Sequence, residues 1–399
     1  MKVLVLGRGV SGDGVVMLFD KYKVNYDYLN KEEVNSFNYL YVVKAPGIPM
    51  DDSIILAFLK LGIDVVTDIW VAMKYSNKMF IGITGSNGKT TTTLLVEHIL
   101  KSKYKVKACG NIGYSVCKAV LDEDIDIFIV ELSSFQLECV KINLDISILL
   151  NINYCHMDHH KSLDEYINSK KNIFSNQTKD KYLIYCYELC EKFVKDCDSN
   201  RIVFSNKYKS DVYYENDSIY YQGDCVIRIG KVKEYMLYNY MAAICCCKLL
   251  GINNEIISEK ILNFEEVKYR CNKINDYIYN DAKSTNPYST IASLKELDNI
   301  FLICGGYDRG ECLEGLDSYI DKIKCVFCYG MSKDKIYRYF SRKEVTCFLF
   351  NNLKEAFLCA LENRKNEIIL YSPMFASFDM FDSYEQRGEL FVELCRKYL

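Results

Sequence analysis

A chain of 399 residues that carries 50 lysines and arginines against 53 aspartates and glutamates has a formal net charge of -3, so its composition gives no bulk attraction to nucleic acid or to an anionic membrane. Hydrophobic residues make up 50% and charged residues 26% of the chain, which excludes a disordered or a fibrous protein. The length predicts two or three domains.

Nineteen cysteines, an odd number, predict reduced thiols rather than a disulfide framework. The apolar run at residues 1–8 is too short for a signal peptide, and the uncharged stretch 236–247 is shorter than the roughly 20 residues that span a bilayer. We therefore expect a cytoplasmic protein that acts as a monomer, with no nucleic-acid partner and no membrane insertion.

The first candidate domain, residues 1–77, opens with the apolar strand 2–6 followed by Gly7-Arg-Gly-Val-Ser-Gly12. Glycines at this spacing after a strand let the backbone approach a phosphate at a helix N-terminus. A nicotinamide site, one alternative for this motif, also needs an acid at the end of the second strand. There Asp27 and Tyr28 leave the position of the acid open.

The second candidate domain, residues 78–265, begins with the strand 79–83 and the loop Thr84-Gly-Ser-Asn-Gly-Lys-Thr-Thr91, which leads into a helical pattern. Backbone N–H groups of such a loop cradle phosphates, a lysine at position 89 can neutralise the β and γ oxygens, and Thr90 can ligate Mg²⁺. An isoleucine replaces the first glycine of the strict G-x-x-x-x-G-K-[ST] pattern, and an ordinary Gly-Lys turn is the alternative.

Chemically active residues follow two further strands of this domain. Glu131 lies in the strand 127–132, so we expect its carboxylate at the carboxyl edge of the sheet, beside the phosphate loop. His156-Met-Asp-His-His160 follows the strand 146–152 and could bind zinc, place a histidine near a phosphate-bound Mg²⁺, or lie in a solvated loop. The segment 218–229 predicts a β-hairpin around a Gly-Asp turn.

The third candidate domain, residues 266–399, alternates predicted strands with helices and ends in an amphipathic helix. The strands are 277–280, 300–304, 325–329 and 368–371, and the helix is 385–399. Polar loops 281–286, 305–310 and 372–378 each follow a strand, and we expect them to form a substrate-sized crevice.

The fold class predicted for the whole chain is α/β in three domains. We expect a Rossmann-like N-terminal domain and a central P-loop ATPase-type parallel sheet with a small antiparallel addition. A Rossmann-like C-terminal domain completes the fold, and the active site is expected in the cleft where the domains meet.

Six motifs, in their order and spacing, resemble those of the Mur ligases along nearly the whole chain. They are Thr-Gly-Ser-Asn-Gly-Lys-Thr-Thr from 84, Glu-Leu-Ser-Ser-Phe-Gln-Leu from 131, Asn-x-x-x-x-His-Met-Asp from 151, Asp-x-Lys-x-Thr-Asn from 281, Ser-Pro-x-x-Ala-Ser-Phe-Asp from 372 and Glu-Gln-Arg-Gly from 385. The resemblance implies an ATP-dependent carbon–nitrogen ligase of peptidoglycan precursor synthesis. The second and sixth motifs are similar to those of the branch that adds D-glutamate to UDP-N-acetylmuramoyl-L-alanine through an acyl phosphate.

Two other functions remain open beside this one. A sister Mur ligase or a folylpolyglutamate-type ligase would use a different acceptor, and an ATP-binding regulator would hydrolyse ATP slowly without ligation. Only the regulator needs no amino-acid pocket.

The resemblance also implies a set of site residues. For ATP they are Gly85, Ser86, Asn87, Gly88, Lys89, Thr90, Thr91, Asn239, Arg270 and Asp281; for the UDP-sugar substrate Val10, Ser11, Asn111, Ser133 and His156; and for D-glutamate Lys283, Thr285, Ser377 and Phe378. Two Mg²⁺ ions are expected, held by Thr90, Glu131, His156 and a carbamylated Lys170, and the catalytic residues would be Lys89, His156 and Lys170.

Two positions depart from the family pattern. Tyr235-Met236 replaces the His-Asn pair expected before Asn239, which changes part of the adenine pocket. The acid on the uracil side is not clearly placed, with Asp27 the nearest candidate and Tyr28 at the aligned position. Neither departure involves the metal or phosphate residues.

Overall fold

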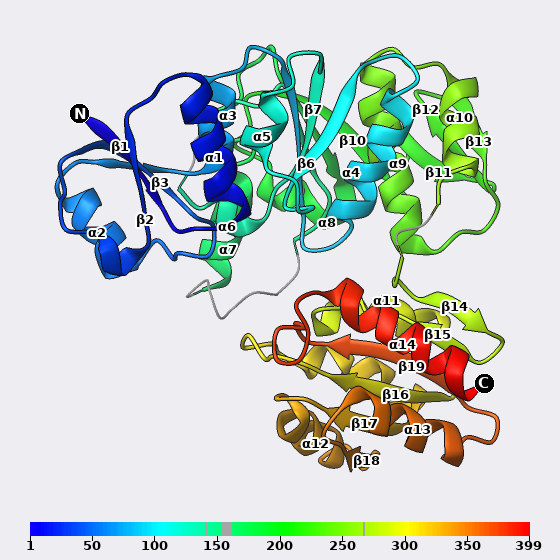
Figure 1. Cartoon of the computed structure of the whole chain (residues 1–399). Coiled ribbons are helices and arrows are strands. Elements are labelled where there is room, and N and C mark those ends of the chain that lie inside the picture. Colours follow the sequence, from blue (N-terminus) through cyan, green and yellow to red (C-terminus); the bar gives the residue numbers. More distant parts are fainter. Residues whose placement is uncertain (140–141, 153–161, 266–267) are drawn as a thin grey trace. The chain divides into compact units, whose positions relative to one another are not determined.

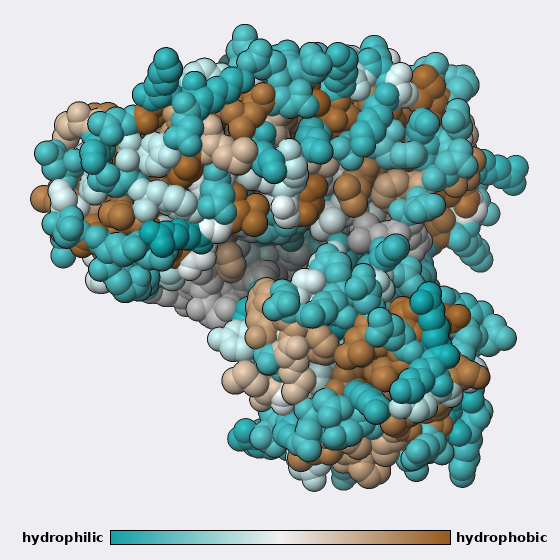
Figure 2. All heavy atoms as spheres, viewed as in Figure 1, coloured by the Kyte–Doolittle hydropathy of each residue, from teal (hydrophilic) through white to brown (hydrophobic). Residues whose placement is uncertain are grey.

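The computed structural model describes residues 1–139, 142–152, 162–265 and 268–399, and the chain folds as two compact units (Figure 1). Residues 1–152 together with 164–264 form the first unit, and residues 265–399 lie in the second. Within the described residues, no helix combines the length and the apolar character that crossing a membrane requires. Figure 2 shows mostly hydrophilic side chains on the face it displays, with hydrophobic ones in smaller areas between them.

The N-terminal sheet of the first unit is parallel, with the strand order β2-β1-β3-β4. Its strands are β1 (Lys2–Leu6), β2 (Tyr26–Leu29), β3 (Tyr39–Lys44) and β4 (Asp64–Val66), and its helices are α1 (Val10–Lys21), the 3₁₀ helix η1 (Lys31–Glu33), α2 (Ser53–Lys60) and α3 (Asp68–Lys74). Alternate residues of β1 pack into two different cores, Val3 and Val5 into one and Leu4 and Leu6 into the other. Helices on both faces explain why this strand is apolar throughout.

The second sheet of the first unit has the order β13-β12-β11-β10-β9-β8-β5-β7-β6 among the described residues. Its strands are β5 (Met79–Thr84), β6 (Val106–Gly110), β7 (Ile127–Glu131), β8 (Ile146–Leu149), β9 (Tyr182–Cys186), β10 (Asn200–Ser205), β11 (Val212–Glu215), β12 (Ser218–Tyr221) and β13 (Asp224–Arg228). Strands β5 to β11 run parallel, whereas β12 and β13 are antiparallel. The predicted hairpin is confirmed, but its two-residue turn is Gln222-Gly223, one residue before the expected Gly-Asp turn, and Tyr221 lies opposite Asp224.

Helices cover this second sheet. They are α4 (Lys89–Leu100), α5 (Val116–Val120), α6 (Ser134–Leu137), α7 (Leu163–Lys171), α8 (Tyr187–Cys190), the 3₁₀ helix η2 (Glu191–Phe193), α9 (Glu234–Leu249) and α10 (Asn254–Leu262). Helices α4 and α9 pack against each other (Figure 1). The three consecutive cysteines 245–247 are fully buried in α9 and belong to the same core as Leu95 and Ile99 of α4, so they pack as small hydrophobic side chains.

The second unit contains a sheet of order β14-β15-β19-β16-β17-β18 among the described residues, parallel except for the β14–β15 pair. Its strands are β14 (Asn272–Asn275), β15 (Ile278–Asn280), β16 (Ile300–Gly305), β17 (Ile323–Tyr329), β18 (Thr346–Leu349) and β19 (Ile368–Met374). Its helices are α11 (Pro287–Glu296), the 3₁₀ helix η3 (Glu314–Lys322), α12 (Lys333–Ser341), α13 (Leu353–Asn363) and α14 (Tyr384–Tyr398).

Local sequence signals fix where several of these helices begin. Asn286 accepts a hydrogen bond from the backbone of Ser289 and is followed by Pro287 at the first position of α11. Ser383 caps α14 in the same way through the backbone N–H of Gln386. Asn and Ser caps satisfy N–H groups that a helix cannot bond internally, and proline at the first position has no N–H to satisfy.

The three sheets, which are mostly parallel and packed with helices, confirm the predicted α/β class.

Candidate functional site

The loop 85–88 joins β5 to α4 and is held by the end of β8. Ser86 donates its backbone N–H to the Asn151 carbonyl at 2.9 Å. Asn87 donates its N–H to the side-chain oxygen of Asn151 at 2.9 Å, and the Asn151 amide donates back to the Asn87 carbonyl at 3.0 Å. Three hydrogen bonds from one residue therefore fix the backbone of the loop before any ligand arrives.

Gly88 is the residue on which the loop turns into the helix. Its φ of +87° lies in the left-handed region, where a side chain is strained. A Cβ at this position would also lie 2.5 Å from Oδ1 of Asn239, a buried residue of α9. The same Oδ1 accepts a hydrogen bond from the Thr92 hydroxyl at 3.2 Å. Asn239, which was predicted to belong to the ATP site although it is distant in sequence, thus lies directly against the loop.

Two lysines from different helices converge on one carbonyl of this loop. The Nζ of Lys89 donates to the Gly85 carbonyl at 2.8 Å and to the Ser86 carbonyl at 3.1 Å. The Nζ of Lys170, on α7, donates to the same Gly85 carbonyl at 3.0 Å and is almost completely buried. Two cations that share one acceptor repel each other, and an anionic ligand at the loop relieves that repulsion.

The start of α4 adds further attraction for an anion. Lys89 and Thr90 occupy the first two positions of this twelve-residue helix, where the backbone N–H groups lack partners within the helix. The positive end of the helix dipole lies at the same place. The loop, the two lysines and the helix end together form a site suited to phosphate groups.

Glu131 brings a buried carboxylate to the same edge of the sheet. It ends β7 opposite Ile83 of β5, and only 2% of the residue is exposed. Its Oε1 accepts a hydrogen bond from the Asn111 side chain at 2.8 Å, whereas Oε2 is buried and has no hydrogen-bond partner among the described residues. A buried carboxylate oxygen without a donor is a suitable ligand for a hard cation such as Mg²⁺, and the Thr90 hydroxyl supplies oxygen of the kind this ion prefers.

Some neighbours of the loop were not identified from the sequence. Asn151 is part of a motif noted there, yet it received no role. Tyr166 of α7 is fully buried, hydrogen-bonds through its hydroxyl to the Ser86 hydroxyl at 2.8 Å, and places its ring 4.7 Å from the Nζ of Lys170. Nothing in the local pattern around a lone tyrosine indicates such a contact.

The predicted residues of the N-terminal sheet lie at the start of α1. Val10 is exposed, and the Ser11 side chain hydrogen-bonds to the buried carboxylate of Asp68. Burial raises the pKa of Asp68, and the hydrogen bond from Ser11 partly offsets that rise.

Asp27 and Tyr28, the two candidates on the uracil side, differ in their contacts. The Tyr28 hydroxyl accepts a hydrogen bond from the Gly9 backbone N–H at 3.2 Å, so Tyr28 lies against the glycine turn. Asp27 instead pairs with Lys2 at 2.7 Å and accepts a hydrogen bond from Tyr39 at 3.0 Å.

Ser133 and His156 complete the predicted residues of the first two candidate domains. Ser133 caps the short helix α6, where its hydroxyl accepts the backbone N–H of Gln136 at 3.3 Å. His156, together with its proposed catalytic, substrate and metal roles, lies outside the described residues.

Asp281 of the second unit is buried, and its carboxylate accepts four hydrogen bonds. Its Oδ2 accepts from the hydroxyls of Ser284, Ser293 and Ser372 at 2.6, 2.9 and 2.8 Å, and its Oδ1 accepts a backbone N–H at 3.1 Å. Burial raises the pKa of Asp281, and the positive charge of Arg270 opposes that rise. The Nε of Arg270 is buried and has no hydrogen-bond partner among the described residues.

The three polar loops of the second unit meet, as the sequence predicted. The Met374 N–H donates to the Ser284 carbonyl at 3.0 Å, which joins the first loop to the third. The Tyr307 N–H donates to the Ala376 carbonyl at 2.8 Å and joins the second loop to the third.

The residues predicted for the amino-acid substrate differ in exposure. Lys283 is 9% exposed, with its Nζ 5.1 Å from the ring centre of Tyr384. Thr285 accepts a hydrogen bond on its carbonyl from Arg309 at 3.4 Å. Ser377 is buried, whereas 66% of Phe378 is exposed.

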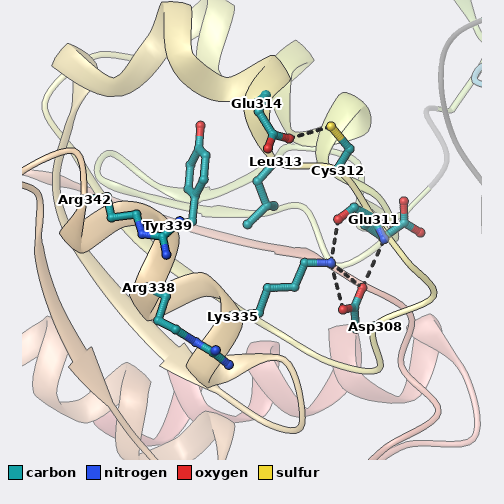
Figure 3. Close-up of a pocket in the computed structure, with 9 residues that line it drawn as sticks. All are labelled: Asp308, Glu311, Cys312, Leu313, Glu314, Lys335, Arg338, Tyr339 and Arg342. Carbon is teal, nitrogen blue, oxygen red and sulfur yellow. Dashed lines mark hydrogen bonds and ion pairs between the residues drawn. The ribbon is translucent and has the colours of Figure 1, made fainter.

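A cavity of about 620 Å³ lies beside the second of these loops (Figure 3). Lys335, Arg338 and Arg342 of α12 line it together with acidic residues of the segment 308–314, and the Lys335 Nζ is bound to both carboxylate oxygens of Asp308 at 2.9 and 2.8 Å. None of the four residues predicted for D-glutamate lines this cavity.

Comparisons with known proteins agree with these features. Residues 83–247 match the Mur ligase middle domain. The UDP-N-acetylmuramoylalanine--D-glutamate ligase of Fusobacterium nucleatum is 34% identical, with 99% of this chain and 99% of that protein covered. A pseudomurein peptide ligase type C from Methanothermus fervidus shares the fold with a TM-score of 0.67 at 17% identity, over 100% of both chains. A MurF ligase from Thermotoga maritima in complex with ADP aligns with a TM-score of 0.62 at 15% identity, over 100% of this chain and 95% of that one.

Proposed function

Because the chain belongs to the Mur ligase family, we propose that it catalyses the ATP-dependent addition of D-glutamate to UDP-N-acetylmuramoyl-L-alanine, a cytoplasmic step of peptidoglycan precursor synthesis. The full-length similarity to ligases of that name supports this reaction. The observation that carries the chemistry is the loop 85–88 at the start of α4, with Lys89 bound to the carbonyls of Gly85 and Ser86. An enzyme that transfers a phosphoryl group needs such a concentration of positive charge.

The chain's own residues would act on the nucleotide at the loop 85–91. Backbone N–H groups of the loop bind the phosphates, and Lys89 neutralises charge on the transferred group. Asn239 fixes the loop from α9, as its contact with Gly88 indicates. Arg270 and Asp281 would complete the nucleotide site from the second unit.

Thr90 and Glu131 would hold Mg²⁺, since Glu131 offers a buried oxygen that receives no hydrogen bond from any described residue. When bound, the metal supplies charge stabilisation for the phosphates. A second ion would be held by His156 and by a Lys170 converted to its carbamate, because the unmodified ammonium would repel a cation. We expect Lys170→Ala to be inactive in phosphate release and to regain part of its activity with a short carboxylic acid in solution; full activity of the variant alone would refute the carbamate.

The remaining substrate contacts divide between the two units. Val10, Ser11, Asn111, Ser133 and His156 would bind the UDP-sugar, and Lys283, Thr285, Ser377 and Phe378 would bind D-glutamate. We place the domain boundaries at 1–77, 78–265 and 266–399 and expect a monomer.

Phosphate release from ATP and Mg²⁺ tests this function directly. The protein is assayed with UDP-N-acetylmuramoyl-L-alanine and, in turn, D-glutamate, L-glutamate, D-aspartate, L-lysine or no amino acid. Release that requires both the UDP-sugar and D-glutamate, with a product heavier by one glutamyl residue, is the expected result. Release with another acceptor would indicate a sister ligase, and release that depends on neither substrate would indicate the regulator.

A further inference from the structure

Arg387, in the first turns of α14, is fully buried and binds one backbone carbonyl. Its Nε and Nη2 both donate to the carbonyl of Ala282, at 3.2 and 2.9 Å. Within the described part of the chain, Arg387 forms no ion pair, and its Nη1 is buried without a hydrogen-bond partner. Burying a guanidinium without a carboxylate partner has a desolvation cost, and here the buried cation binds a single peptide carbonyl.

That peptide group lies at the centre of the second unit's candidate site. Ala282 stands between Asp281 and Lys283, which the proposed function assigns to the nucleotide and to D-glutamate. Its N–H donates to the Asn280 side chain at 3.1 Å. Fixing both ends of this residue restricts the backbone torsions that aim the two neighbouring side chains.

Gly388, the next residue, also contacts the strand end that precedes Ala282. Its carbonyl accepts the Asn280 side-chain amide at 3.0 Å, and a Cβ on Gly388 would lie 2.6 Å from the ring of Tyr269. The Tyr269 carbonyl in turn accepts the Lys283 backbone N–H at 2.9 Å. The absence of a side chain at Gly388 therefore lets Tyr269 approach and anchor Lys283.

We propose that Arg387, with Gly388, is a positioning residue that sets the Asp281–Lys283 segment for binding the amino-acid substrate. The proposal rests on the proposed function for the identity of that substrate. Arg387 lies in the Glu-Gln-Arg-Gly motif, yet no binding or catalytic role was assigned to it from the sequence.

Arg387→Lys keeps the charge but cannot place two N–H groups on one carbonyl. We expect it to remain folded and to exchange the backbone amides of residues 281–283 at least about tenfold faster than the wild type. The KM for D-glutamate should rise about tenfold, whereas the KM for the UDP-sugar stays unchanged, because its proposed residues other than His156 lie in the first unit. Arg364→Lys is the matched control, because Arg364 also binds a carbonyl of this unit, that of Glu367 at 2.7 Å, away from the segment.

A second variant tests the same role if Arg387→Lys does not fold. Arg387→Ala should lose activity with D-glutamate and regain part of it with millimolar guanidinium but not with sodium at equal ionic strength. Unchanged amide exchange in folded Arg387→Lys overturns the positioning role whatever the enzyme's substrate proves to be. Equal rises in both KM values, or no rise, also overturn the positioning role. If phosphate release by the wild type does not depend on D-glutamate, only the proposed function is refuted.

Discussion

Two buried carboxylates at the ends of parallel strands, one in each unit, have opposite surroundings. Asp281 follows β15, is 1% exposed and accepts four hydrogen bonds from the protein. Glu131 ends β7, is 2% exposed and leaves one oxygen without any donor among the described residues. The two side chains are similarly buried near a strand end, and they differ in the number of hydrogen-bond donors that reach them.

The number of hydrogen bonds that a buried carboxylate accepts indicates whether it stabilises the fold or binds a ligand. A buried carboxylate that accepts hydrogen bonds on both oxygens stabilises its own loop and is satisfied without a ligand. A carboxylate that is buried with an open oxygen is costly for the apoprotein and is retained where a cation completes it. This criterion favours Glu131 over Asp281 as the proposed metal ligand, while Asp281 binds the hydroxyls of Ser284, Ser293 and Ser372.

The largest effect is expected at Glu131. Glu131→Gln keeps the size of the side chain but removes the charge that would hold Mg²⁺, and loss of several kcal/mol at about 1.4 kcal/mol per factor of ten predicts a fall in phosphate release of roughly 100-fold or more. Raising the Mg²⁺ concentration should restore part of the rate. Glu97→Gln is the control, because the Glu97 carboxylate already accepts the Ala108 N–H at 2.9 Å and pairs with Lys101. Equal rates for both variants would remove the distinction between open and occupied carboxylates.

A smaller effect is expected at the turn into α4. Gly88→Ala places a Cβ at positive φ, which lowers the unfolding free energy by about 1–2 kcal/mol. The same Cβ overlaps Asn239, and this overpacking lowers the unfolding free energy by about 1–3 kcal/mol more. Gly113→Ala separates the two causes, because Gly113 has a φ of +95° but no atom within 4 Å of an added Cβ. Urea unfolding of both variants measures the difference. A cost for Gly88→Ala no larger than that for Gly113→Ala would show that Asn239 does not press on the loop.

The smallest effect concerns Asp281 and pH. Because burial raises the pKa of Asp281, the folded state binds its proton more tightly than the unfolded state. The stabilising contribution of the protonated form is therefore present below about pH 4 and is lost as pH rises through the folded-state pKa. Asp281→Asn lacks this titration, so its unfolding free energy should improve relative to wild type between pH 4 and pH 7, as followed by urea unfolding. A difference that stays constant or changes in the other direction would contradict the raised pKa.

Much of the fold followed from local sequence patterns. Continuous apolar runs predicted β1, β5, β7, β16 and β17 because strands covered by helices on both faces need apolar side chains throughout. Glycine-containing loops indicated where α4 and the hairpin of β12 and β13 lie, since each loop depends on a few adjacent residues. Strands β9, β10 and β11 were not predicted, although they extend the same sheet.

The candidate site was predicted less completely, for a physical reason. The loop 85–91, Glu131 and Asn239 came from motifs and from the family resemblance, and the structure brings them together. The roles of Asn151, Tyr166 and Arg387 were not predicted, because each acts through a contact with a residue distant in sequence. Contacts of this kind leave no periodicity or spacing for a single sequence to reveal.

The α/β class, the family and the candidate phosphate loop could be predicted from the sequence, because they depend on short-range order along the chain. Three contacts become visible only in the folded chain: Tyr28 rather than Asp27 bonds to the glycine turn, and Lys89 and Lys170 share one carbonyl. The third is the Glu131 oxygen, which receives no hydrogen bond from the described residues. Hydrogen-bond occupancy is a property of groups that packing brings within about 3 Å of each other. It exists only once the elements that carry those groups have folded together.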